Sequence, residues 1–386
     1  MILEMKSIIP FEKPKRILHI VSAMNRGGAE TMIMNLYRNV DRKAIQFDFV
    51  SHLGVENDFE QEILSMGGVV YKIGSLGTTG FLKYFKSLKK VIKTGGFEIV
   101  HAHNDIQMGI VLFIALLSGV KLRIAHAHST KWDTDDKKNN SLFYKGLRLA
   151  LNVFSNKKVA CGVDAAKFMF SKKFLGDIFF LNNGIEIEKF SNINPEIIQG
   201  IKNEFNISSE LVIGHIGRFD LAKNQSFLIE IARILRNKNF EFKMLLVGEG
   251  ALREELEEKV TILNLNKFVF FLRVREDINV LMNTFDLFVF PSVFEGLPVT
   301  LIEAQAAGTK ILMSDNITDE AIIYKDLVIK LYLDNIEAWV EKIINSKKRS
   351  DSESFDVSLL VEKGYSAKAN VGKLYQIYNI DLTGGV

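Results

Sequence analysis

FDLFVFPSVFEGLPVTLIEAQAAG, residues 285–308, carries the clearest signature of the fold class in this chain. Its opening apolar run ends at Pro291, which is typical of a strand buried on both faces of a parallel sheet. A short loop follows, and Pro298 marks the start of a helix, because a proline in the first turn costs no hydrogen bond. Strand, loop and helix in this order predict one unit of an α/β fold.

The same alternation of apolar runs and helical patterns fills the rest of the chain in two series. We expect strands in the first series at 16–21, 47–51, 69–73, 99–102, 122–127, 158–160 and 179–181, and in the second at 211–216, 242–247, 268–271, 287–290, 310–313 and 327–329. A polar break near Pro195 separates them. The sequence therefore predicts two doubly wound, Rossmann-like α/β domains, residues 1–192 and 193–366, that face a central cleft.

Composition excludes several classes of protein. Of the 386 residues, 47% are hydrophobic and 25% charged, the ordinary balance of a globular chain rather than a disordered one. The single cysteine, Cys161, excludes an internal disulfide framework and favours the cytoplasm. The first 15 residues lack a signal-peptide pattern, and the longest apolar stretch, 109–120, falls short of the roughly 20 residues that span a bilayer.

Charge is unevenly distributed along the chain. Residues 1–190 hold 27 Lys and Arg against 18 Asp and Glu, and the remainder hold 22 against 28. Within the basic half, the segment from Phe81 to Lys93 carries five lysines around an apolar stripe at 81, 85, 88 and 92. This pattern predicts a helix that docks on an anionic membrane surface, with a helix packed on the core as the alternative. We expect no nucleic-acid partner.

Two loops of the second half carry residues suited to a diphosphate. Arg218 and Lys223 follow the strand at 211–216: arginine binds two oxygens at once, and lysine acts as a point charge. In the segment 285–308, Gly296 and Leu297 precede a helix, where free N–H groups attract an anion. The alternative is a pair of exposed, solvated loops.

Two carboxylates lie at or near the helix that begins at Pro298. A glycine-rich turn comes before a different helix of the second half. Glu295 lies before the helix and Glu303 within it, a placement that suits a ribose diol or, alternatively, a helix N-terminal carboxylate and a solvated side chain. The run Val-Gly-Glu-Gly at 247–250 resembles the opening of a dinucleotide-binding fingerprint. Because Arg253 stands where its last glycine belongs, the run predicts a strand–loop–helix unit rather than an NAD site.

The first half offers glycines and paired histidines. Gly27 and Gly28 follow the first strand and allow close approach to a ligand, or form a tight turn. Alternate residues of a strand face the same way, so the pairs 101/103 and 126/128 each present two imidazoles. No Cys or carboxylate accompanies them at ligand spacing, and an Asp-x-Asp motif at 133–135 lies in a polar loop, so we expect no metal. Polar residues of a cleft are the preferred interpretation.

Together these residues resemble the family 4 retaining glycosyltransferases of the two-domain GT-B fold, above all the branch that builds bacterial exopolysaccharide and capsule. The shared segments are Arg-Gly-Gly-Ala-Glu at 26–30, His-Ala-His-Ser at 126–129, Ala-Cys-Gly at 160–162, Asn-Asn-Gly-Ile-Glu at 182–186, Gly-Arg-Phe…Lys-Asn at 217–224 and Phe-Glu-Gly-Leu-Pro…Glu-Ala at 294–304.

The resemblance implies a role for each matching position. Arg218 and Lys223 would bind the donor diphosphate, Glu303 the ribose, and Glu295 the transferred sugar near the reacting centre. The remaining implied residues are His128 beside the sugar, His103 and His126 as further cleft histidines, Gly27, Gly28, Gly296 and Leu297 against the ligand, and Arg273 and Val274 beside the nucleobase pocket. Arg273 departs from the glycine that is usual there.

The expected activity is transfer of a hexose or N-acetylhexosamine from a UDP-sugar to a glycan acceptor, with retention and without a cofactor. The acceptor would be a lipid-linked oligosaccharide at the inner face of the cell membrane. The C-terminal segment, about 367–386, would pack back on the first domain. A nucleotide-sugar epimerase of the same fold and a non-catalytic sugar-nucleotide-binding subunit stay open as alternatives.

Overall fold

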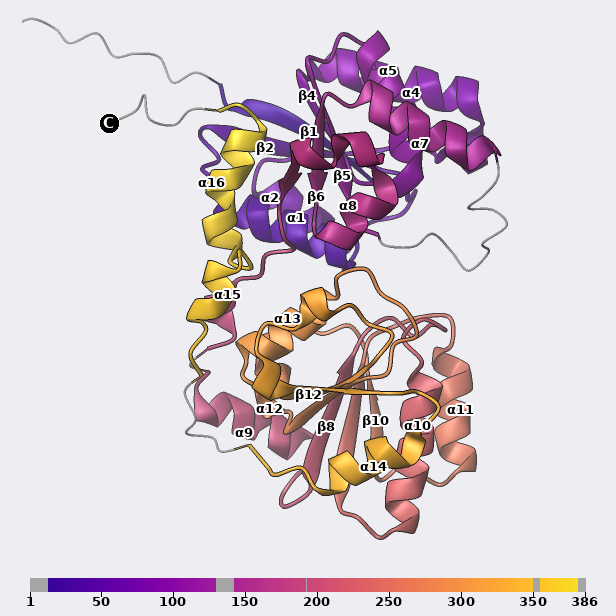
Figure 1. Cartoon of the computed structure of the whole chain (residues 1–386), viewed down its shortest axis with the longest axis vertical. Helices are drawn as coiled ribbons and strands as arrows, with labels where there is room; N and C mark the ends of the chain where they lie inside the picture. Colours follow the sequence, from indigo (N-terminus) through magenta and orange to yellow (C-terminus); the bar gives the residue numbers. More distant parts are fainter. Residues whose placement is uncertain (1–12, 130–141, 192, 350–354, 381–386) are drawn as a thin grey trace, which may run out of the picture.

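The computed structural model describes residues 13–129, 142–191, 193–349 and 355–380, which form two α/β units (Figure 1). The first unit is built on a seven-stranded sheet of order β3-β2-β1-β4-β5-β6-β7. Its strands are β1 (Lys15–Val21), β2 (Ile45–Ser51), β3 (Val70–Lys72), β4 (Ile99–Ala102), β5 (Leu122–Ala127), β6 (Lys157–Ala160) and β7 (Ile178–Phe180). Its helices include α1 (Gly28–Asn39), α2 (Glu60–Ser65), α3 (Leu76–Thr79), α4 (Phe81–Gly95), α5 (Met108–Leu117), α7 (Leu142–Phe154) and α8 (Val163–Met169).

The second unit is built on a six-stranded sheet of order β10-β9-β8-β11-β12-β13. Its strands are β8 (Leu211–Ile216), β9 (Phe242–Val247), β10 (Val269–Leu272), β11 (Leu287–Phe290), β12 (Lys310–Ser314) and β13 (Val328–Leu331). The helices that accompany it are α9 (Pro195–Glu204), α10 (Gln225–Asn237), α11 (Arg253–Ile262), α12 (Ile278–Thr284), α13 (Val299–Ala306) and α14 (Ile336–Ile344).

Every strand pairing in both sheets is parallel, which confirms the predicted α/β fold class. The central strands are buried on both faces, as the unbroken apolar runs indicate; all residues of β2, β8 and β11 are buried, whereas the edge strands β3, β7 and β13 are partly exposed. The strand order reverses between β1 and β4 in the first sheet and between β8 and β11 in the second. Ligands of such sheets bind beyond the carboxyl ends of the strands at this reversal.

The last described residues pack on the first unit. After β13 and α14 it passes through α15 (Ser358–Glu362) into α16 (Ala367–Ile377), which lies beside α1 (Figure 1). Leu374, Ile377 and Tyr378 enter the same hydrophobic core as Ile17 and Phe47. The last helix therefore completes the core beneath one face of the first sheet.

The basic segment from Phe81 to Lys93 lies in helix α4, but its buried stripe differs from the predicted one. Tyr84, Leu88 and Ile92 are buried, whereas Phe81 at the helix start is 44% exposed. The helix therefore packs on the core through one face and leaves an apolar residue at its amino end in solvent. Within the described residues, no helix combines the length and apolarity needed to cross a bilayer.

Candidate functional site

The loop between β11 and α13 forms the centre of the candidate site. Pro298 is the extended residue that caps α13, with φ of −72° and ψ of 111°. Gly296 lies against the first unit: a Cβ atom at this position would stand 2.7 Å from the backbone oxygen of His128. This close approach explains the glycine, and it brings the predicted residue His128 to the loop that carries Glu295.

A partly buried ion pair joins this loop to the loop after β8. The Nζ of Lys223 lies 2.6 Å from Oε1 of Glu295, and the two side chains are 18% and 15% exposed. The same ammonium lies 4.9 Å from the centre of the Phe290 ring. Gly217 makes room for the lysine stem, since a Cβ atom there would lie 3.1 Å from Cδ of Lys223. Two predicted residues, 72 positions apart in sequence, thus meet at the reversal point of the second sheet.

The glycine-rich turn after β9 has a packing role. Gly248 adopts φ of +144°, and a Cβ atom at this position would collide with the carbonyl oxygen of Gly217. A Cβ atom at Gly250 would likewise collide with the backbone of Phe219. These glycines let the β9 loop support the β8 loop, in which Arg218 is exposed. The result agrees with the predicted strand–loop–helix unit.

Glu303 lies on α13, beyond the loop. Burial raises the pKa of its carboxyl group to about 7. A carboxyl group with this pKa exists in both protonation states near neutrality and can accept or donate a hydrogen bond. Such a group is suited to a hydroxyl-bearing ligand.

The first unit presents the amino end of α1 to the amino end of α13. Gly27 caps α1, and a Cβ atom on Gly28 would lie 3.7 Å from Cγ2 of Val299, the first residue of α13. Free N–H groups at two facing helix starts produce a positive potential. The predicted glycines therefore stand where the two units meet.

Glu30, which we did not predict as a site residue, also lies at the start of α1, next to Gly27. Its carboxylate occupies the space where a Cβ atom of Gly27 would be. Burial raises the pKa of Glu30 to about 7, and the charge of Arg218 across the junction partly opposes this shift. The Arg-Gly-Gly-Ala-Glu segment contained the signal, since it ends on this residue.

The predicted histidines form one cluster in the first sheet with His19 of β1. Nδ1 of His103 lies 2.9 Å from Nε2 of His128, and Nε2 of His103 lies 3.0 Å from Nδ1 of His19. Nε2 of His101 lies 3.2 Å from Nδ1 of His126. His103 and His126, which we expected to line a cleft, are buried, and His128 is the partly exposed member next to Gly296.

Burial keeps these imidazoles neutral. It lowers the pKa of His19 to about 3 and that of His128 to about 4, and it holds the pKa values of His101, His103 and His126 well below the usual one. Two triads of histidines place nitrogen atoms within 4.8 Å of one another. Hydrogen bonds between the rings account for this closeness, and the expected absence of a metal stays a prediction.

Contacts beside the site tie the two units together. The carboxylate of Glu320 accepts hydrogen bonds from the backbone N–H groups of Val163 and Asp164, at 3.1 and 3.2 Å. Gly162 precedes them, and a Cβ atom there would collide with that carboxylate. Arg26 forms a 2.7 Å ion pair with Glu276. The Ala-Cys-Gly segment is therefore a docking point for the second unit.

Other predicted residues lie further out. Arg273 and Val274 follow β10 and are exposed, with Nε of Arg273 3.8 Å from a carboxylate oxygen of Glu249. Their predicted place beside a nucleobase stays a prediction. The Asp-x-Asp motif at 133–135 falls outside the described residues.

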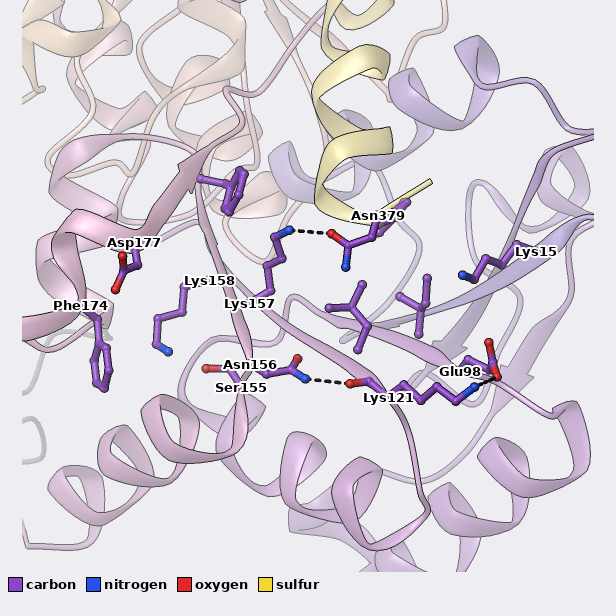
Figure 2. A pocket seen from close by; sticks show the side chains of 14 residues that line it. Lys15, Glu98, Lys121, Ser155, Asn156, Lys157, Lys158, Phe174, Asp177 and Asn379 are labelled. Atoms are coloured by element: carbon purple, nitrogen blue, oxygen red, sulfur yellow. Dashed lines mark hydrogen bonds and ion pairs between the residues drawn. The ribbon is translucent and has the colours of Figure 1, made fainter. Parts of the chain in front are cut away.

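A cavity of about 680 Å³ lies at the opposite edge of the first sheet. Its lining includes the first residues of several strands, among them Lys15, Ile99, Leu122 and Lys157. Figure 2 shows that Lys157 hydrogen-bonds to Asn379 and that Lys121 pairs with Glu98. This edge is the amino end of the strands, so the cavity is separate from the site at their carboxyl ends.

Comparison with known proteins identifies the family. The profile of Glycosyltransferase Family 4 matches residues 26–167, and that of Glycosyl transferases group 1 matches residues 210–346. The glycosyltransferase EpsF of Bacillus subtilis (strain 168) is 38% identical over 372 residues, which cover 95% of this chain and 97% of EpsF. The chain belongs to glycosyltransferase family 4.

Two further comparisons place this family 4 glycosyltransferase. The capsular polysaccharide biosynthesis glycosyltransferase CapH of Staphylococcus aureus is 29% identical over 367 residues, covering 90% of this chain and 97% of CapH. The crystal structure of Anabaena HepE in complex with UDP and glucose superposes with a TM-score of 0.73 at 16% identity, covering 94% of this chain and 99% of HepE. This structural likeness confirms the predicted GT-B fold.

Proposed function

We propose that this glycosyltransferase transfers a hexose or N-acetylhexosamine from a UDP-sugar to a lipid-linked glycan acceptor, with retention of the anomeric configuration. The observation that carries the proposal is the close approach of His128 to Gly296, beside the partly buried pair of Lys223 and Glu295. This contact brings His128 of the first unit next to Lys223 and Glu295 of the second unit. The complex of HepE with UDP and glucose supports a donor of this class.

The site's own groups suit departure of a nucleoside diphosphate. The Lys223 ammonium, which pairs with Glu295, would also form an ion pair with the diphosphate. Arg218 and the N–H groups at the start of α13 would donate hydrogen bonds to the same diphosphate. Glu303 would bind the ribose hydroxyls. The acceptor hydroxyl would attack the face from which the diphosphate departs, and its proton would pass to a diphosphate oxygen. In this scheme the cations and helix N–H groups stabilise the developing charge, and no metal takes part.

UDP release by the purified chain tests the proposed activity. UDP-sugars are supplied with and without a lipid-linked saccharide, and the anomeric configuration of the product is read by NMR. Acceptor-dependent UDP release with a retained anomeric centre is the expected result. A sugar epimerised without net UDP release would favour an epimerase, and tight UDP-sugar binding without turnover on any acceptor would favour a binding subunit.

Helix α4 is the proposed membrane contact. Lys83, Lys86, Lys90 and Lys93 are exposed on it, and Leu82 at its start is 75% exposed. Four ammonium groups around an exposed apolar side chain suit an anionic bilayer. This contact would bring the first unit to a lipid-linked acceptor.

Charge reversal on α4 is expected to weaken membrane binding. Each lysine near an anionic surface contributes about 1 kcal/mol, so Lys86→Glu with Lys90→Glu should lower binding to anionic liposomes at least about tenfold. Flotation at low salt measures this effect. Ile262→Asp on α11, where the apolar side chain is 69% exposed, is the matched control and should float like the unmodified chain. A native chain that stays at the bottom of the gradient contradicts membrane docking.

A further inference from the structure

The histidine cluster continues into the last helix segment through Tyr378. The hydroxyl of Tyr378 lies 2.9 Å from Nδ1 of His101 and 3.4 Å from Nε2 of His19. Tyr378 is 1% exposed and follows α16 directly. With the contacts between the rings, six side chains form one hydrogen-bonded series: His126, His101, Tyr378, His19, His103 and His128.

The chemistry of neutral imidazole makes this series directional. A neutral histidine carries one N–H donor and one bare nitrogen acceptor, and a tyrosine hydroxyl donates one proton while it accepts another. Each of the four inner members uses both of its positions within the series. If every link is a hydrogen bond, all the protons must therefore point the same way along it.

The two ends are the only positions in the series that this rule leaves open. Nε2 of His126 and Nδ1 of His128 are buried and make no hydrogen bond of full geometry within the described residues. The backbone of Leu181 acts on His126 and the side chain of Asn183 acts on His128, and each raises the pKa of the ring beside it. In one arrangement His126 carries the outer proton and His128 presents a bare Nδ1; in the other the roles are exchanged. The tautomer of His128 is thus linked to the orientation of a hydroxyl that comes from the far end of the sequence.

We infer that Tyr378 is a positioning residue for His128. By joining the two halves of the series, its hydroxyl ties the position of the proton on His128, beside Gly296, to its position on His126, where the backbone of Leu181 favours a protonated ring. This inference rests on the proposed function, in which His128 lies beside the transferred sugar. A fixed tautomer matters there because a donor and an acceptor recognise different sugar hydroxyl geometries.

Tyr378→Phe tests the inference, because it removes only the hydroxyl. The ring that remains keeps its edge-on contacts with Phe47 and His101, at centroid separations of 6.4 and 5.7 Å. Tyr375→Phe is the matched control: it removes a hydroxyl from the last turn of α16, just before Tyr378, and this hydroxyl accepts a 2.9 Å hydrogen bond from the N–H group of Asp41. Thermal unfolding of both variants checks that they are folded.

The decisive readout is 15N NMR of the chain labelled at its seven histidines, in which protonated and bare ring nitrogens have distinct shifts. We expect one tautomer of His128 in the native chain and in Tyr375→Phe, and a mixture of two in Tyr378→Phe. Where a hydrogen bond orients a metal-binding histidine, its loss costs about 10- to 100-fold in metal affinity or activity, and we take the same range as the expected effect on His128. We expect that loss in kcat, with little change in KM for the UDP-sugar.

Unchanged His128 signals in folded Tyr378→Phe overturn the inference, and so does a fall in kcat without a change of tautomer. If Tyr378→Phe does not fold, His19→Leu interrupts the same series beside Tyr378, and the same change in the His128 signals is expected. Native turnover in His128→Ala would instead contradict the role of His128 in the proposed function. The NMR result would then still decide whether Tyr378 positions the ring.

Discussion

Lys223→Ala is expected to lower kcat/KM for sugar transfer by about 10² to 10³, the usual effect of removing one preorganised group that stabilises developing charge. Lys223 is 18% exposed and pairs with Glu295 at 2.6 Å, so water cannot fully replace its charge. Without it, the diphosphate would depart beside a partly buried carboxylate. Steady-state UDP release measures the loss.

The matched control for this substitution is Lys259→Ala. Lys259 also pairs with a glutamate, Glu230, at 2.8 Å, but on the helices α10 and α11 of the second unit. The Lys259→Ala variant should retain turnover, and UDP should still raise its melting temperature. Both properties should be reduced in Lys223→Ala. A native rate of sugar transfer in folded Lys223→Ala would contradict the proposed site. Equal losses of activity in the two variants would show a general effect on the second unit.

Acidification is expected to unfold the chain between about pH 6 and pH 4. The pKa of His215 is also lowered, to about 4, so six histidines in the described residues are held neutral by deep burial, and burial lowers the pKa of the seventh, His52, as well. Unfolded histidines take up protons below about pH 6.5, whereas the folded ones do not. Their contribution to stability is therefore complete above that pH and is lost as the pH falls.

Two carboxyl groups act in the opposite direction. Because the pKa values of Glu30 and Glu303 are raised to about 7, the folded chain holds these protons near pH 5 to 6 more tightly than the unfolded chain. Six protons taken up on unfolding and two released leave about four, or roughly 5 kcal/mol of stability lost per pH unit. Domains are stable by about 5 to 15 kcal/mol, so one to three pH units suffice.

Circular dichroism across a pH series measures this transition. Replacing His19 by Asn removes one titrating imidazole and should flatten the dependence by about one proton, whereas His52→Gln, outside the series, should have a smaller effect. A chain that remains fully folded at pH 4 would contradict the neutral, buried state of the histidines.

The sequence predicts the fold well because buried parallel strands leave unbroken apolar runs. The expected strand at 287–290 coincides with β11, and that at 179–181 lies one residue from β7. Helix α7 was not predicted: Leu142, Phe143 and Leu149 are exposed, so its apolar residues do not mark a buried stripe. Helix α9 was missed because Pro195 was interpreted as a linker, whereas it opens a helix capped by Asn194.

The candidate site could be predicted only in part. Lys223 and Glu295 follow adjacent strands at a reversal of strand order, and that rule brings them together from sequence alone. The approach of Arg218 to Glu30, and of Glu320 to α8, depends on how the two units dock, which no local pattern encodes. The alternation of side chains along a strand predicts that the two histidines of each pair point to the same face of the sheet. Their burial could not be predicted in this way, because it depends on the neighbouring strand β1 and on Tyr378.

The return of α16 to the first sheet also sets the order of events during synthesis. The core around Ile17 and Phe47 needs Leu374 and Ile377 to close. About 200 residues separate β7 from the end of α16, and at about 5 to 20 residues per second they take roughly 10 to 40 seconds to translate. Throughout that interval the nascent first unit exposes an apolar face that a chaperone can bind, and a message truncated near its 3′ end would yield a chain that never covers it.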